Sequence, residues 1–286
     1  METLLGLPAN IVVPVFASIV IFLAGLFVNF IVVVFKKHRS RLETKQNIII
    51  FLSGLRETLK QYIINLRELS NNIEKSEKMQ PEAFHYVELS LSYFREFHVG
   101  QVADALLHGI SPKNTDLRTI RINFYMYNVQ IDFLMSVKAK IEEAYDEYRA
   151  IIHKLMDRWN NIWVEFCQDI YKSQVTDSLS DDERNIYSQI DEILNDLGKK
   201  YKGQDVPSSV MVPCLGQFSH ILSKSSSPAL SHMRLTNVLM SRLYCERLSM
   251  NGCCQLFASY ANDLDRVYDK LSELLVFYRK CKTRWL

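Results

Sequence analysis

The chain has few of the residues that interrupt helices. Only 9 of its 286 residues are glycine and 7 are proline. Sandwiches and barrels need many turns, and turns rely on these two residues, so the composition disfavours such folds and favours long helices. The net charge is only +2, which indicates neither a basic surface for nucleic acid nor an acidic tail.

Common catalytic and nucleotide-binding motifs are also missing. The sequence contains no G-x-x-x-x-G-K-[ST] and no G-x-G-x-x-G, so neither common phosphate-binding loop is present. Two Ser-His pairs occur, at 219–220 and 231–232, but no G-x-S-x-G elbow accompanies them. We therefore expect no catalytic residues and no cofactor.

Metal-ligand spacing is equally sparse. Glu82 and His85 have the i, i+3 spacing of one half of a di-iron site, but the chain has no second Glu-x-x-His. Asp181, Asp182 and Glu183 stand where a helix is expected to begin, so we interpret them as a solvated cap rather than a divalent-ion site. We expect no metal.

Cysteine is confined to the C-terminal part of the chain. None of the six cysteines precedes Cys167, and their spacing is not that of a small disulfide scaffold. We expect reduced thiols that pack as small apolar residues, which is typical of a cytosolic compartment.

What the chain does have is one long apolar run, residues 11–35, without a charged side chain. At a rise of about 1.5 Å per residue it can cross a hydrocarbon core of about 30 Å. A cleaved signal peptide is the alternative, but it would need a basic segment before a shorter run. Here the preceding segment carries Glu2 and no Lys or Arg. We therefore predict a transmembrane helix over 11–35, after a short extracytoplasmic tail over 1–10.

Basic residues follow the apolar run and do not precede it. The positive-inside rule then places the N-terminus outside the cell and the rest of the chain in the cytosol. The membrane that the helix crosses is then the cell membrane, which in bacteria is the inner membrane. We expect this juxtamembrane collar, residues 36–47, to contact lipid headgroups as well. Its basic members are Lys36, Lys37, Arg39, Arg41 and Lys45. The C-terminal sequence RKCKTRW is also basic, and either an ordinary helix end or a segment lying on the membrane fits it.

One face of the predicted span carries small and polar residues. Pro14, Ser18, Gly25 and Asn29 are separated by 4, 7 and 4 positions, which keeps them on one side of a helix. Small residues and amides promote helix association in lipid. Asn29 is the most informative of them, because an amide in hydrocarbon seeks a partner. Self-association, pairing with a partner span and simple tolerance of these residues all remain open.

Apolar residues then recur at alternating steps of 3 and 4, as in a heptad seam. The first such seam predicts that the membrane helix continues to about Lys78, before Pro81. Its members are Ile48, Leu52, Leu55, Leu59, Tyr62, Leu66, Leu69 and Ile73. A second helix is expected to begin at Pro81, with an apolar stripe that includes Phe84, Val87 and Leu91.

Two further seams extend over residues 114–169 and 230–285. The first has no Gly or Pro up to Ser180 and predicts one helix of about 60 residues, capped at Asn114 or Thr115. A break at 176–182 is followed by a helix that stops near Lys202. We expect an irregular hinge or docking loop at 204–228, containing one short helix, and then a last helix from Ala229 to the end.

These patterns predict an all-α protein. It consists of a single N-terminal transmembrane helix followed by an elongated cytosolic bundle of long helices, divided into 48–175 and 176–286. Such a chain suits a non-enzymatic membrane effector or adaptor, for example in bacterial anti-phage defence or a toxin-like system. Its expected partners are membrane lipid, a cytosolic protein and a second copy bound through the span and first coil. The alternatives are a passive scaffold that tethers a cytosolic complex to the membrane and, least favoured, an enzyme with an unfamiliar helical site.

Overall fold

The computed structural model describes most of the chain. The described residues are 3–4, 7–89, 91, 102, 105, 114–176, 179–202 and 204–280. Side chains are described from Val13 onward, and those of 114–117, 174 and 175 are not.

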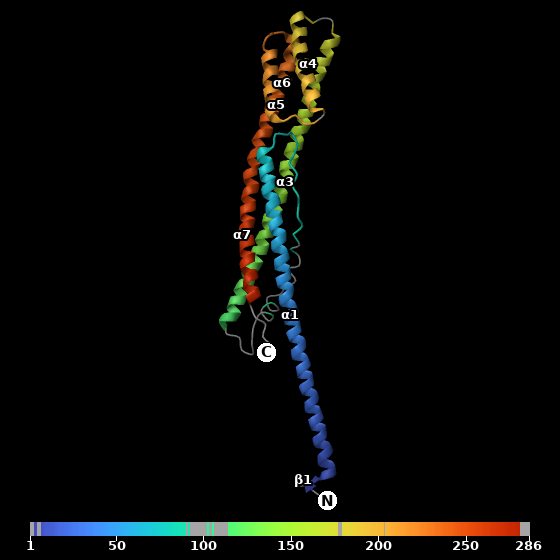
Figure 1. Ribbon diagram of the computed structural model, residues 1–286, viewed down its shortest axis with the longest axis vertical. Helices are drawn as coiled ribbons and strands as arrows, with labels where there is room; N and C mark the ends of the chain where they lie inside the picture. Colours follow the sequence, from blue (N-terminus) through green and yellow to red (C-terminus); the bar gives the residue numbers. More distant parts are fainter. Residues whose placement is uncertain are drawn as a thin grey trace. The chain divides into compact units, whose positions relative to one another are not determined.

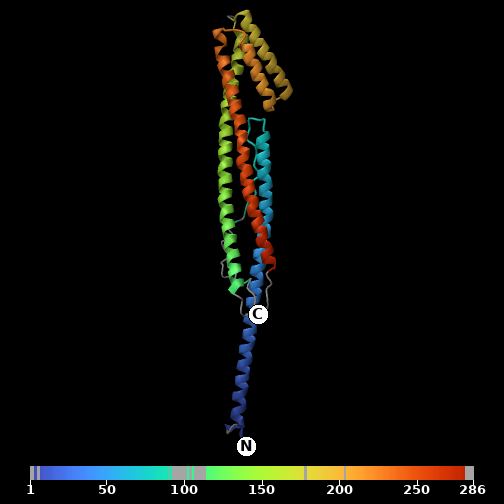
Figure 2. The ribbon, with the colours of Figure 1, turned by 90° about the vertical axis from the view of Figure 1, so that its left-hand side faces the viewer.

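The regular secondary structure of the described residues is helical apart from a pair of two-residue strands at the beginning, as Figures 1 and 2 show. This confirms the predicted all-α class. The strands, β1 and β2, pair antiparallel over Thr3–Leu4 and Leu7–Pro8. The α-helices are α1 (Ala9–Lys75), α3 (Asn114–Val175), α4 (Asp181–Tyr201), α5 (Ser208–Leu222), α6 (Ser231–Ser249) and α7 (Cys253–Lys280), with 3₁₀ turns η2 (Pro228–Leu230) and η3 (Met250–Gly252).

Helix α1 joins the apolar run to the first seam without a break. All eight residues predicted for that seam are buried, with Leu52, Leu59 and Leu66 fully enclosed. Apolar positions at steps of 3 and 4 thus select one face of the helix for packing. The helix ends at Lys75, a few residues before the expected Lys78.

The helix predicted from Pro81 is absent, because residues 81–89 are irregular. The hydroxyl of Tyr145 in α3 takes up two backbone groups that a helix would have bonded internally. Tyr145 Oη donates to the carbonyl of Glu82 at 3.1 Å and accepts from the amide of Phe84 at 3.0 Å. Phe84 is buried as predicted, but from an irregular segment. Most of the remaining stripe lies outside the described residues.

Helix α3 confirms the long second seam. Every described member from Ile120 to Phe166 is buried except Lys138 and Ile162, which are half-buried. Lys138, the one charged position in the seam, donates to Glu142 at 2.6 Å, one turn further along. An i, i+4 ion pair allows the lysine stem to pack while its charge stays at the edge.

The predicted start of α4 is confirmed in detail. Ser180 and Glu183 form a reciprocal capping box, with Ser180 N–H donating to Glu183 Oε2 at 2.8 Å. The helix stops at Lys202, which adopts a left-handed conformation (φ 40°). Such caps satisfy backbone groups that the helix ends leave unbonded.

The rest of the chain differs from the prediction in two places. Helix α5 occupies 15 residues of the stretch expected to be mostly irregular. The last helix is not continuous from Ala229, because the 3₁₀ turn η3 separates α6 from α7. Asn251 in that turn donates to the carbonyls of Glu74 and Ser76, and this contact accompanies the tighter winding. Cys281 and Trp285, predicted to end the seam, lie outside the described residues.

The chain divides into two compact units, each made of separate segments. Unit 1 comprises 1–59, 88–133 and 267–286, and unit 2 comprises 60–87 and 134–266. In unit 2, aromatic pairs join α3 to three other helices: Trp159 to Tyr244, Phe166 to Phe218 and Tyr148 to Phe257. The elongated bundle and the sequence-based domain boundaries stay predictions.

Candidate functional site

The apolar part of α1 is long and hydrophobic enough to cross a membrane. Its best 18-residue window has a mean hydropathy of 2.8, and none of that window is buried. A core helix of a soluble protein with this hydropathy would be mostly buried, so burial does not account for the composition. A signal sequence near the N-terminus has a similar profile. Phe16, Phe22 and Phe27, each more than 60% exposed, exemplify the surface that lipid would cover.

The predicted association face is exposed on this part of α1. Pro14, Ser18, Gly25 and Asn29 are all exposed and lie on one side of the helix. A Cβ atom built at Gly25 would have no neighbour within 4 Å. Glycine is therefore not required here by the single chain, and this position is free to serve a close approach by another helix.

The two hydrogen-bonding residues of this face differ. Ser18 Oγ donates to the carbonyl of Pro14 at 2.8 Å, so the hydroxyl is satisfied within its own helix. Asn29 has no side-chain hydrogen bond to any described residue. In hydrocarbon an unbonded amide is costly, and a second helix is the natural source of its partner.

The juxtamembrane collar is part of the same helix. Lys36, Lys37 and Arg39 are exposed, and Arg41 and Lys45 are half-buried. Arg39 Nε pairs with Glu43 Oε1 at 2.9 Å, an exposed i, i+4 contact that salt would screen. The collar therefore keeps an exposed excess of positive charge next to the apolar segment.

A buried arginine in unit 2 was not predicted. Arg247 of α6 is 1% exposed, and its guanidinium fork reaches the chain just after the end of α1. Nε donates to the carbonyl of Lys78 at 2.9 Å, Nη2 to Ser76 Oγ at 2.8 Å and Nη1 to Asn251 Oδ1 at 2.7 Å. The negative end of the α1 dipole favours a cation at this place.

The Arg247 contacts continue into the irregular segment after α1. Ser76 Oγ donates to Glu82 Oε1 at 2.7 Å, so one hydroxyl connects the guanidinium to a carboxylate. A buried charge needs such partners, and here they tie together α1, α6 and segment 76–84. A signal was present in the sequence, because Arg247 follows Met240 and Leu243 at helical spacing on the buried face of α6.

The segment predicted as a hinge is held by hydrogen bonds from two side chains, those of Arg234 and Ser227. Arg234 Nε donates to the carbonyl of Leu222 at 3.1 Å, where α5 ends, and its Nη2 bonds the carbonyls of Ser225 and Ser227. Ser227 Oγ in turn donates to Glu183 of the α4 cap. This bond and those from Ser180 hold the pKa of Glu183 below its usual range. The role of segment 204–228 as a hinge or docking loop stays a prediction.

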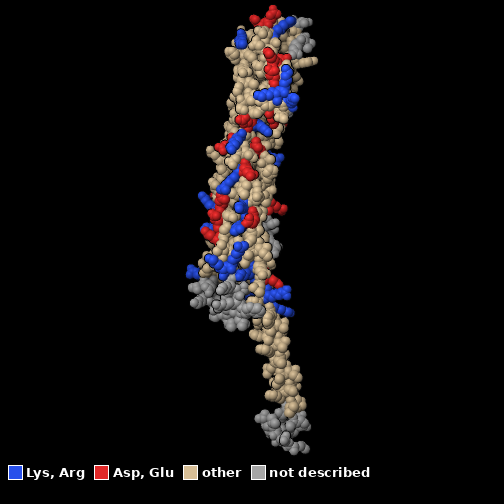
Figure 3. Space-filling model, viewed as in Figure 1, with Lys and Arg blue, Asp and Glu red and all other residues tan. Residues whose placement is uncertain are grey.

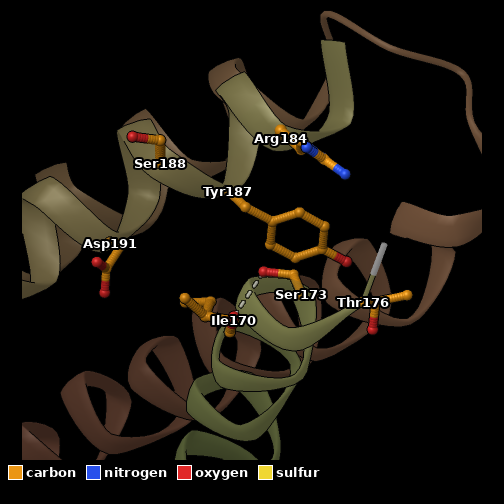
Figure 4. A pocket seen from close by; sticks show the side chains of 7 residues that line it. All are labelled: Ile170, Ser173, Thr176, Arg184, Tyr187, Ser188 and Asp191. Atoms are coloured by element: carbon orange, nitrogen blue, oxygen red, sulfur yellow. Dashed lines mark hydrogen bonds between the residues drawn. The ribbon is translucent and has the colours of Figure 1, made fainter. Parts of the chain in front are cut away.

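One pocket lies between the end of α3 and the beginning of α4 (Figure 4). Its volume is about 280 Å³. The Tyr187 ring from α4 reaches toward α3, and burial raises the pKa of its hydroxyl. Ser173 Oγ donates to the carbonyl of Ile170. The lining residues are Ile170, Ser173, Thr176, Arg184, Tyr187, Ser188 and Asp191.

The serines of the two Ser-His pairs, 219–220 and 231–232, are bonded to other parts of the chain. Ser219 Oγ accepts from Asn237 Nδ2 at 2.7 Å, and Ser231 Oγ donates to the carbonyl of Pro228 at 2.6 Å, so both hydroxyls are occupied by structural bonds. His232 Nδ1 contacts Asp169 Oδ2 at 2.5 Å. Among the described residues, no group of three or more His, Cys, Asp or Glu side chains is arranged to hold a metal ion.

Comparison with known proteins gives no relative. No protein-family model, curated protein or solved structure matches this chain.

Proposed function

We propose that the chain is a non-enzymatic, single-pass membrane protein with its N-terminus outside and its helical region in the cytosol. The observation that carries this proposal is the continuity of α1 from the exposed apolar segment, through the basic collar, to the buried seam. An apolar segment of this length is stable in lipid, and the collar favours the cytosolic side.

In this proposal the cytosolic helices bind a protein partner and control how the spans associate. An unbroken helix transmits rotation or displacement, because each turn is fixed to the next by backbone hydrogen bonds. Asn29 and Gly25 then form the contact between spans. The protein acts as a membrane-perturbing effector or adaptor, of the kind that bacterial anti-phage or toxin-like systems use.

The test is depolarisation of the membrane on expression of the full chain in cells, read with a potential-sensitive dye. Asn29→Leu and Gly25→Leu remove the amide and the close-approach position and should each abolish depolarisation. Phe27→Leu is the matched control, because Phe27 is 64% exposed on the opposite face of the helix. It should leave depolarisation intact.

Other outcomes identify other functions. Full depolarisation by both variants would mean that this face does not act on the membrane. Loss of depolarisation in all three variants, with unchanged insertion, would also contradict a face-specific contact. If wild-type protein inserts without depolarising but retains a cytosolic protein when purified in detergent, the passive scaffold is the better description.

A further inference from the structure

The end of α7 in unit 1 points toward the juxtamembrane collar. Arg279 Nη2 donates to Ser53 Oγ of α1 at 3.2 Å, and the Arg56 guanidinium carbon lies 6.0 Å from the centre of the Tyr268 ring. Figures 1 and 2 show that the two helices are antiparallel, with the red end of α7 beside α1 on the side of the span.

The beginning of α3 lies at the same end of unit 1. Tyr127 of α3 and Tyr278 of α7 are both buried, and burial together with the nearby Tyr278 raises the pKa of Tyr127. Arg118 and Arg121 precede Tyr127 by about two turns and are exposed. In Figures 1 and 2 this green end of α3 points toward the same end of unit 1 as the red end of α7.

Positive charge dominates at this end of the three helices. The described side chains of 36–47, 118–126 and 274–280 include five, two and two basic residues, nine in all, against the single acidic residue Glu43. Figure 3 shows lysine and arginine gathered on this part of unit 1, next to the uncharged span. We name the set the basic end: Lys36, Lys37, Arg39, Arg41, Lys45, Arg118, Arg121, Arg279 and Lys280.

We propose that the basic end docks on the anionic lipid headgroups of the membrane that α1 crosses. The inference rests on the proposed insertion of α1, which holds this surface next to one leaflet. Lys45 lies ten residues beyond Phe35, about 15 Å along the helix, and the headgroup layer takes up about 5–8 Å of that distance. Arg279, bonded to Ser53 about 27 Å beyond Phe35, reaches the headgroups only by leaving that bond. Long basic side chains extend toward the surface, and anionic lipid attracts them within a Debye length of about 10 Å. α3 adds exposed Ile122 and Tyr125, a combination typical of membrane interfaces.

This contact would couple lipid composition to the arrangement of α3 and α7. The collar alone needs only α1, whereas the basic end needs residues from three helices. Removing the charges of α3 and α7 should therefore leave insertion and orientation intact and change only the contact of these two helices with the membrane.

The test uses full-length protein in nanodiscs of phosphatidylcholine alone, and of phosphatidylcholine containing phosphatidylglycerol. Hydrogen exchange of 118–126 and 274–280 is followed by mass spectrometry, with α5 as an internal reference. We expect exchange of both segments to be several-fold slower in the anionic discs, and this difference to shrink in high salt. The variant Arg118→Gln, Arg121→Gln, Arg279→Gln, Lys280→Gln should lose the difference.

A matched variant removes four exposed lysines from unit 2: Lys140→Gln, Lys154→Gln, Lys172→Gln, Lys199→Gln. It should retain the lipid-dependent protection. Equal exchange in both discs for wild-type protein, or equal loss in the two variants, would overturn the proposal. Resistance to alkaline extraction, measured on the same samples, separates this failure from a failure of α1 to insert, which would instead contradict the proposed function.

Discussion

The guanidinium of Arg247 donates to the hydroxyl of Ser76 at 2.8 Å and to the carbonyl of Lys78 at 2.9 Å, inside unit 2. One buried side chain thereby satisfies polar groups in the segment that follows α1. Methionine at 247 would match its length but leave these groups without a donor, at a cost of about 1–3 kcal/mol for each buried group.

We therefore expect Arg247→Met to lower the free energy of unfolding by about 3 kcal/mol, measured by urea denaturation in detergent. Arg242→Met is the control on the same helix. The Arg242 side chain is 75% exposed and pairs only with Glu246 among the described contacts. It should change stability by no more than about 0.5 kcal/mol. Equal effects of the two substitutions would show that the Arg247 contacts do not stabilise the fold.

The irregular segment 81–89 depends on Tyr145. Its hydroxyl bonds the backbone on both sides of Ala83, as donor to Glu82 and acceptor from Phe84. Tyr145→Phe keeps the ring and removes both bonds, so we expect a loss of about 1–2 kcal/mol and faster hydrogen exchange of the Phe84 amide. Tyr171→Phe, at a side chain 69% exposed, is the control and should alter neither quantity. Unchanged exchange at Phe84 in Tyr145→Phe would contradict this account.

The seams were predictable because they depend on local spacing. Leu52, Leu59 and Ile141 are fully buried at positions that the alternating steps of 3 and 4 select. Ser180 caps α4 together with Glu183, three positions further along. Apolar periodicity and caps are properties of a few consecutive residues, and a sequence displays them directly.

The features that the sequence did not predict depend on residues far apart along the chain. Segment 81–89 has the apolar spacing of a helix, but its backbone is bonded by Tyr145, 63 residues away from Glu82 along the chain. The Arg247 contacts likewise join residues that are 169 and 171 positions apart. Long-range hydrogen bonds override a short helical pattern, and no single stretch of sequence reveals them. In the predicted site, the exposure of the α1 face followed from its composition. That Ser18 is bonded within its own helix and Asn29 is not became evident only from the structure.

Glu183 should make stability depend on pH in acid. Hydrogen bonds from Ser227 and Ser180 stabilise the carboxylate, so its pKa in the folded chain is below its ordinary value of 4.5. The resulting stabilisation is present above that value and is lost as pH falls through the folded pKa. We expect Glu183→Gln to reduce the stability difference between pH 6 and acid, measured by thermal unfolding. Asp182→Gln, at an exposed side chain in the same first turn, should retain the wild-type difference.

The contrast between Asn29 and Ser18 gives the sharpest test of the span. Ser18 Oγ is already bonded to Pro14, so Ser18→Ala should leave association of the spans nearly unchanged. Asn29→Leu removes the amide that has no bond to a described residue, and interhelical polar bonds in lipid contribute about 0.6–2 kcal/mol. We expect the dissociation constant of the full chain to rise about three- to thirty-fold, measured by energy transfer between labelled copies in bilayers. If Ser18→Ala weakens association as much as Asn29→Leu, the small residues act by packing and the amide has no special role.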